Sequence, residues 1–173
     1  MEFFARGRRS EVFKDFYKGK LVAVKKGAKK VVEKEYKFLK ILNKHGVGPK
    51  VYFVKKDCVV YEFVEGVAFK DFIKGKDISE VKPIVLEILR QCRVLDKIGI
   101  NKLEFTRPLK HVFVGDNVIM IDFERCYYTD KPKNVSQFCA FLEGRFKVDL
   151  REEVKKYKKS YLERDFKRIL RKI

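Results

Sequence analysis

The chain has 173 residues, and 46% of them are hydrophobic, which is enough for one compact domain or for two small lobes that share a cleft. Lys and Arg total 42 against 24 Asp and Glu, so the net charge is +18. This excludes the strongly acidic composition that is typical of disordered chains. Such a balance favours a polyanionic partner: RNA, DNA or an anionic membrane surface. A lysine-rich thermophile surface is the alternative.

The sequence also argues against a membrane protein and against a disulfide-stabilised protein. No apolar run approaches the length that spans a bilayer. The first residues turn basic at once instead of continuing as a signal peptide, so we expect a soluble, cytoplasmic protein without a membrane partner. The cysteines contain no CxxC pair and stand beside apolar residues, which indicates reduced core positions rather than a disulfide frame or a zinc site: Cys58, Cys92, Cys126 and Cys139.

The first third of the chain predicts a β-β-α-β-β order. Residues 11–16 and 21–25 are short apolar segments on either side of a turn, as in a hairpin. Residues 31–44 have the spacing of an amphipathic helix. Two further strands, at residues 51–54 and 59–63, are joined by a turn rich in lysine.

The rest of the chain is mainly helical in pattern. Asp77 followed by Glu80 predicts a capping box at the start of a helix that ends at Gly99. A lobe boundary is expected near Gly66. The other expected elements are an irregular stretch at residues 103–114, two short strands around the turn at residues 115–117, a short helix from Asn134, and one final helix over about residues 150–173.

Asp122 follows directly on an apolar strand, where a carboxylate is well placed to hold a metal ion beside a phosphate chain. Lys25 ends an earlier strand, and Glu35 lies on the next predicted helix. A buried lysine needs a partner, and Glu35 can supply it, with Glu33 as the competing carboxylate. An ordinary surface ion pair is the alternative. Lysine, helical glutamate and strand-end Asp-Phe form, in that order, the phosphate-handling skeleton of protein kinases.

Two further segments fit a nucleotide site. Backbone groups near Glu62 and Val64, where an apolar strand reaches a glycine, would bond the adenine edge; a plain strand end is the alternative. The basic loop at residues 5–10 has only one glycine, but its arginines can neutralise phosphate directly. The candidate phosphate contacts there are Gly7, Arg8 and Ser10, and a disordered basic N-terminus is the other interpretation.

On these residues the chain resembles a small atypical protein kinase. It is most similar to the archaeal predicted serine/threonine kinases related to the RIO family and to the small kinase of the KEOPS complex, over nearly its whole length. Residues 22–25 resemble the lysine motif, and residues 34–42 and 45–52 resemble the glutamate helix and its exit. Residues 61–66 resemble the hinge. Residues 121–123 resemble the metal-binding Asp-Phe-Gly motif, with Glu124 in place of its glycine.

The resemblance also points to a catalytic loop. Where the family has Ile-Val-His-Gly-Asp-Leu, this chain has residues 100–105, so Glu104 matches the catalytic aspartate. The loop asparagine that holds a second metal is missing. His111, as a metal ligand, or Lys110, as a phosphate cation, stands near that place. The segment after Asp122 is too short for a usual activation segment and peptide-binding lobe.

The final predicted helix is rich in lysine and arginine, and many of these residues lie on the face opposite its apolar stripe. Because the related kinases work beside tRNA and pre-ribosomal RNA, the resemblance implies contact with structured RNA or a ribonucleoprotein; a solvated face is the alternative. The cations concerned include Lys155, Lys156, Lys158, Lys159, Lys167, Arg168, Arg171 and Lys172.

The fold class expected is therefore α+β, a minimal two-lobed kinase-like fold with a sheet and one helix in residues 1–66 and a reduced helical lobe in residues 67–173. ATP with Mg²⁺ or Mn²⁺ would occupy the cleft, with the metal on Asp122 and His111, and Glu104 would act on an acceptor hydroxyl. A nucleotide-binding pseudokinase or RNA- or protein-binding scaffold is the main alternative, and a small-molecule phosphotransferase is another. The protein substrate is not identified by the sequence.

Overall fold

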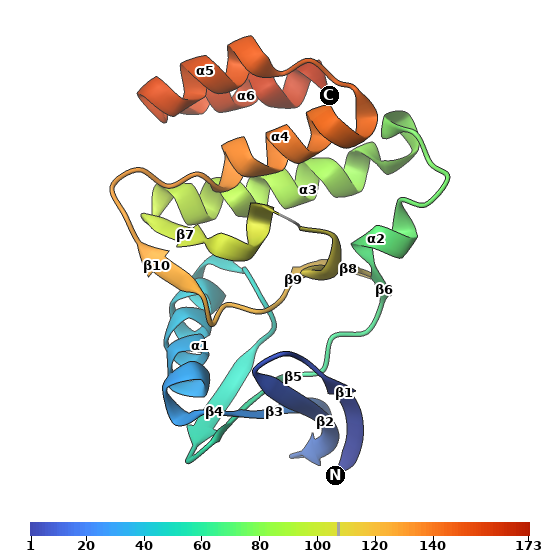
Figure 1. Cartoon of the computed structure of the whole chain (residues 1–173), viewed down its shortest axis with the longest axis vertical. Coiled ribbons are helices and arrows are strands. Elements are labelled where there is room, and N and C mark those ends of the chain that lie inside the picture. Colours follow the sequence, from blue (N-terminus) through green and yellow to red (C-terminus); the bar gives the residue numbers. More distant parts are fainter. Residues whose placement is uncertain (107) are drawn as a thin grey trace.

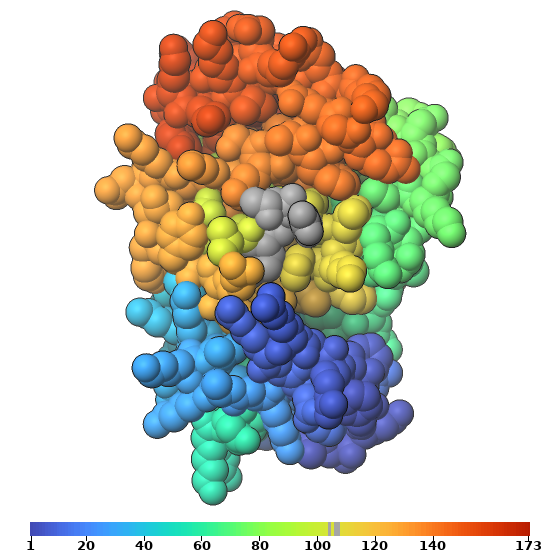
Figure 2. All heavy atoms as spheres, in the orientation of Figure 1, coloured from blue at the N-terminus to red at the C-terminus, as the bar shows by residue number. Residues whose placement is uncertain are grey.

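The computed structural model describes residues 1–106 and 108–173, with the side chains of all of these except Glu104 and Thr106. A five-stranded antiparallel sheet with one long helix forms the N-terminal part, and a mainly helical part follows (Figure 1). The expected α+β class is thus confirmed. The space-filling view shows the blue N-terminal part packed beneath the orange and red C-terminal part (Figure 2).

The sheet places Lys25 on its central strand. Its strands, in sheet order, are β1 (Glu2–Arg6), β2 (Ser10–Tyr17), β3 (Lys20–Gly27), β5 (Cys58–Glu62) and β4 (Val51–Lys55). In β3, Val22 and Val24 pack on one face of the sheet, while Ala23 joins the main core on the other. Because side chains alternate along a strand, Lys25 lies on the same face as Ala23.

The first strand, β1, was not predicted. It pairs with β2, with Phe3 opposite Phe13, and its phenylalanines Phe3 and Phe4 remain exposed. The sequence signal was weak because this edge strand buries little apolar surface. Consequently Gly7 lies in the loop between β1 and β2 rather than before the first strand, and the basic N-terminus is an ordered hairpin.

The long helix α1 (Lys29–Leu42) packs on the sheet through Val32, Leu39 and Leu42, and continues into η1 (Asn43–His45). Gly48, just beyond it, has φ 77°, and a Cβ there would lie 2.8 Å from Leu39 and 2.9 Å from the ring of Phe123. Glycine is therefore required where the exit of this helix meets the Asp-Phe segment.

The predicted capping box is confirmed at the start of α3 (Ile78–Lys97), where Asp77 accepts from the backbone of Ser79 and Glu80, and the side chain of Glu80 accepts from the backbone of Asp77. The two strands predicted around residues 115–117 are β8 (Val112–Val114) and β9 (Val118–Met120). Short elements not predicted are β6 (Val67–Ala68), α2 (Phe69–Phe72), β7 (Ile100–Lys102), η2 (Leu103–Thr106), η3 (Pro108–Lys110) and β10 (Cys126–Tyr128).

The prediction of one final helix is wrong. After α4 (Asn134–Phe146), the chain forms α5 (Arg151–Ser160) and α6 (Glu163–Lys172), which lie side by side (Figure 1). The break falls at Tyr161, with φ 51°. Its carbonyl accepts from Arg93 at 2.7 Å and its hydroxyl donates to the carbonyl of Pro132 at 2.8 Å, so tertiary contacts stabilise the turn.

One hydrophobic core runs through both parts of the chain, from the α1 face of the sheet to α3, α4 and α6. In the described part of the chain no disulfide joins the four cysteines, and all but Cys58 are buried. Within the same residues, no helix combines the length and apolarity needed to cross a membrane.

Candidate functional site

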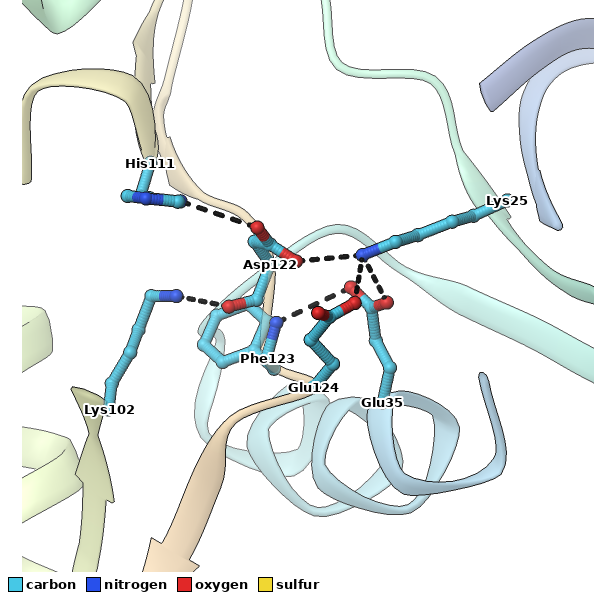
Figure 3. A network of polar contacts seen from close by, with 7 residues as sticks. All are labelled: Lys25, Glu35, Lys102, His111, Asp122, Phe123 and Glu124. Atoms are coloured by element: carbon cyan, nitrogen blue, oxygen red, sulfur yellow. Dashed lines mark hydrogen bonds and ion pairs between the residues drawn. The ribbon is translucent and has the colours of Figure 1, made fainter. Parts of the chain in front are cut away.

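The ammonium of Lys25 is the centre of a buried charged cluster (Figure 3). Its Nζ lies 2.7 Å from Glu35 Oε2, 2.7 Å from Asp122 Oδ1 and 3.0 Å from Glu124 Oε2. Lys25 is only 5% exposed and Glu35 only 1%. The sheet, α1 and the segment after β9 therefore meet at one cation, which lies close to three carboxylates and donates a hydrogen bond to Asp122.

The cluster settles the choice between the two helix carboxylates. Glu35 binds Lys25, whereas Glu33 is half exposed and lies 3.8 Å from Lys29 on its own helix. The Lys25–Glu35 pair is fully enclosed, so the interpretation as an ordinary surface ion pair is wrong. A pair at this depth needs further polar partners, since desolvation of both charges is costly.

The electrostatics keep Lys25 charged. Burial opposes its ammonium form, yet the nearby carboxylates of Glu35 and Asp122 outweigh burial and raise the pKa of Lys25. Burial raises the pKa of Glu35 more than Lys25 lowers it. Burial also disfavours the ionised form of Asp122, but Lys25 and Lys102 together lower the pKa of this carboxyl. Asp122 is thus an ionised carboxylate next to two cations.

Asp122 is held in an uncommon backbone conformation, with φ 70°. The residue before it donates its amide to the carbonyl of His111 at 2.9 Å, and the amide of Phe123 donates to Glu35 Oε1 at 3.3 Å. Phe123 itself is fully buried. A left-handed aspartate persists only where its surroundings fix it, and such residues cluster at ligand sites.

Lys102 is a site residue that the sequence analysis missed. Its side chain is fully buried, its ammonium donates to the carbonyl of Asp122, and it lies 4.7 Å from the ring centroid of Phe123. The available signal was its position within residues 100–105, the expected catalytic loop, where only Glu104 was given a role. Glu124 was noticed only as a replacement for glycine, and its contact with Lys25 was not foreseen.

His111 faces the other oxygen of Asp122. Its Nδ1 lies 3.5 Å from Asp122 Oδ2, and this buried nitrogen has no hydrogen-bond partner among the described residues. Burial, helped by Lys102, lowers the pKa of His111 to about 4, so the imidazole is neutral near pH 7. Lys110, the alternative at this place, is exposed.

A divalent metal fits this side of Asp122. A neutral imidazole with an unpaired nitrogen and an ionised carboxylate are both metal ligands in proteins. Ligand oxygens of Glu35, Asp122 and Glu124 also lie within 4.8 Å of one another, but the ammonium of Lys25 already sits among them. The Asp122 Oδ2–His111 side is therefore the place where the residues present suit a metal.

The other predicted residues lie elsewhere along the sheet. Gly7 donates its amide to the carbonyl of Ser10 at 2.8 Å, and Arg8 is exposed in the same loop between β1 and β2. Glu62 ends β5 and donates its amide to the carbonyl of Lys50 at 2.8 Å, so this amide is not the group that would contact adenine in the hinge hypothesis. Val64 follows two residues later. The prediction for Glu104 falls on a side chain outside the described residues.

Comparison with known proteins gives a family and a fold. A family model described as the RIO domain matches residues 2–140. The solved complex of Rio2 kinase with ADP/Mg²⁺ and phosphoaspartate from Chaetomium thermophilum matches with a TM-score of 0.67 and 16% identity. The alignment covers 85% of this chain and 57% of that one, so the chain spans little more than half the length of that kinase. No match was found among curated proteins.

Proposed function

The chain belongs to the RIO domain family, and on that premise we propose that it is an ATP-dependent phosphotransferase, an atypical RIO-like protein kinase with serine or threonine as acceptor. The observation that carries the proposal is the buried contact of Lys25 with both Glu35 and Asp122. These three residues come from a strand, a helix and a loop far down the chain, and a kinase needs them together to hold phosphates and metal.

In this proposal ATP lies between the sheet and the Asp122 segment. Lys25 binds the phosphates, the loop with Gly7, Arg8 and Ser10 covers them, and the carbonyl of Glu62 and the amide of Val64 bond the adenine. Asp122 and His111 hold Mg²⁺ or Mn²⁺, which would neutralise charge on the transferring phosphate. The ADP/Mg²⁺ complex of the structurally similar Rio2 kinase supports this choice of ligands.

Lys102 has a positioning role in the same scheme. By holding the carbonyl of Asp122 and covering Phe123, it fixes the carboxylate that would receive the metal. Glu104 is proposed to orient or deprotonate the acceptor hydroxyl, a task for which a carboxylate is suited. The proposed lobes are residues 1–66 and 67–173. An archaeal origin, a relation to the KEOPS kinase and a cytoplasmic location stay predictions.

A nucleotide-binding pseudokinase is the second candidate. The observation that favours it is Glu124, which stands in place of the glycine of Asp-Phe-Gly and bonds the lysine that a nucleotide would use. In that case the cluster binds nucleotide or a partner without transfer, and the replaced catalytic-loop residues have no chemical role.

An RNA partner is proposed for the opposite end of the molecule. Because the final helix is broken, its cations are divided between α5 and α6. A groove of about 680 Å³ between α4 and α5 instead gathers the cations Lys133, Arg151, Lys155, Lys158 and Lys159, with Glu143 as the acidic residue among those that line it. Such a groove suits a phosphate backbone, whose binding should weaken as salt rises.

Transfer of radiolabelled phosphate from ATP, to the chain itself or to water, tests the kinase proposal. Wild type should transfer phosphate with Mg²⁺ or Mn²⁺, and Lys25→Met and Asp122→Asn should lose the activity by about a thousandfold or more. Glu33→Gln, on the exposed side of α1, is the matched control. Nucleotide binding without any transfer by wild type would favour the pseudokinase.

A further inference from the structure

Three carboxylates surround the Lys25 ammonium at short distance. Asp122 Oδ1 accepts a hydrogen bond from Nζ at 2.7 Å, and ion-pair contacts place Glu35 Oε2 at 2.7 Å and Glu124 Oε2 at 3.0 Å from the same nitrogen. A phosphate oxygen that is to bind Lys25 must therefore displace one of these three carboxylates.

Glu124 is the carboxylate that can leave. Glu35 is fully enclosed on α1 and also accepts from the amide of Phe123. Asp122 is fixed by Lys102 through its carbonyl and faces His111. Glu124 lies in the loop between β9 and β10, and its contact with Lys25, at 3.0 Å, is the longest of the three.

The net charge of the cluster also indicates competition between its carboxylates and a phosphate. One ammonium faces three carboxylates, so a phosphate that approaches Lys25 meets an excess of negative charge (Figure 3). Removal of a neighbouring carboxylate charge from an enclosed site strengthens the attraction between the remaining cation and an incoming anion.

We infer that Glu124 is a built-in competitor of nucleotide phosphate: its carboxylate takes the phosphate position on Lys25 and must swing away before a nucleotide can bind. The inference rests on the proposed role of Lys25 in phosphate binding. It assigns Glu124 a function opposite to that of a metal ligand, since its removal should tighten binding instead of weakening it.

Calorimetric titration of ATP, with and without Mg²⁺, tests the inference on the full chain. Glu124→Gln removes the charge and keeps the shape, and Glu124→Ala removes both. We expect each variant to bind ATP about tenfold or more tightly than wild type, with the larger gain when Mg²⁺ is absent. Glu33→Gln changes the net charge equally on an exposed face of α1 and should bind as wild type does.

Tripolyphosphate is a second probe, because it lacks the adenine. The gain from Glu124→Gln should appear with this ligand too, and it should vanish in a Lys25→Met background if it acts through that lysine. Weaker or unchanged binding by both Glu124 variants, with wild type still binding ATP, overturns the inference and leaves the proposed function intact. Absence of ATP binding in wild type and both variants overturns the proposed function and, with it, the inference.

Discussion

Two buried polar clusters connect elements of this molecule, and their compositions are opposite. Around Asp96, one carboxylate of α3 is surrounded by donors: the amide of Asn134 at 3.0 Å, its side chain at 2.8 Å and the hydroxyl of Tyr157 at 2.7 Å. Around Lys25, one ammonium is surrounded by three carboxylates. In the first cluster several donors satisfy one carboxylate, and in the second three carboxylates share one positive charge.

The difference is the one expected between a structural cluster and the proposed ligand site. The Asp96 cluster joins α3, α4 and α5, since Tyr157 also accepts from Arg93 and Asn134 also bonds the backbone of β7. Burial raises the pKa of Asp96 in spite of these bonds. The Lys25 cluster keeps an excess of carboxylate over cationic groups around one ammonium. Fully satisfied networks stabilise a unique fold, whereas an unbalanced one is poised for a partner.

The largest expected effect is on the structural cluster. Asp96→Ala leaves the buried hydroxyl of Tyr157 and the amide groups of Asn134 without their acceptor, so the free energy of unfolding should fall by about 3–5 kcal/mol. Urea denaturation measures it. Asp116→Ala, on an exposed turn, should change the value by less than about 0.5 kcal/mol. A similar small loss in Asp96→Ala would show that this network contributes little.

Asp122→Asn should separate function from stability. Without ligand, the free energy of unfolding should change by less than about 1 kcal/mol, because the substitution removes one of three crowded carboxylates. Mg-ATP at a hundredfold excess over Kd should stabilise wild type by about 2.7 kcal/mol and the variant hardly at all. Equal stabilisation of both proteins in chemical denaturation would remove Asp122 from the site.

Lys102→Met should have an intermediate effect. The apolar stem is kept, but the carbonyl of Asp122 loses a charged donor, which should cost about 2 kcal/mol of unfolding free energy. Lys97→Met, at an exposed ion pair with Glu163, should cost at most about 1 kcal/mol. If denaturant titrations show an equally small loss of unfolding free energy in both variants, Lys102 does not fix the Asp-Phe segment.

The smallest effect is a pH dependence of the ligand-free protein. Because the pKa of His111 is about 4 in the folded state against an ordinary 6.5, the unfolded chain takes up a proton first as pH falls. His111 therefore contributes stability fully above pH 6.5, and this is lost between pH 6.5 and 4. We expect about 1 kcal/mol, since the group is partly exposed. His111→Gln should flatten this part of the stability profile, and His45→Gln, at an exposed site, should not.

The comparison also explains what the sequence could predict. The hairpin, α1, the capping box of α3 and the Asp-Phe turn depend on local pattern, and each was placed from it. Lys25, Glu35 and Asp122 were recognised because residue type and order carry the signal. Lys102 and Glu124 act only through contacts made across the fold, so neighbouring residues did not reveal them. The break at Tyr161 has the same cause, because Arg93 and Pro132 stabilise a turn that contains neither glycine nor proline.

The most direct test of the central claim, that Lys25 and Asp122 form a nucleotide and metal site, is the calorimetric binding of Mg-ATP to wild type and Lys25→Met. Circular dichroism first verifies that the variant is folded. We expect saturable, one-to-one, metal-dependent binding by wild type and a loss of about a hundredfold or more in affinity in the variant. Absence of binding by wild type, or equal affinity in folded Lys25→Met, would contradict it.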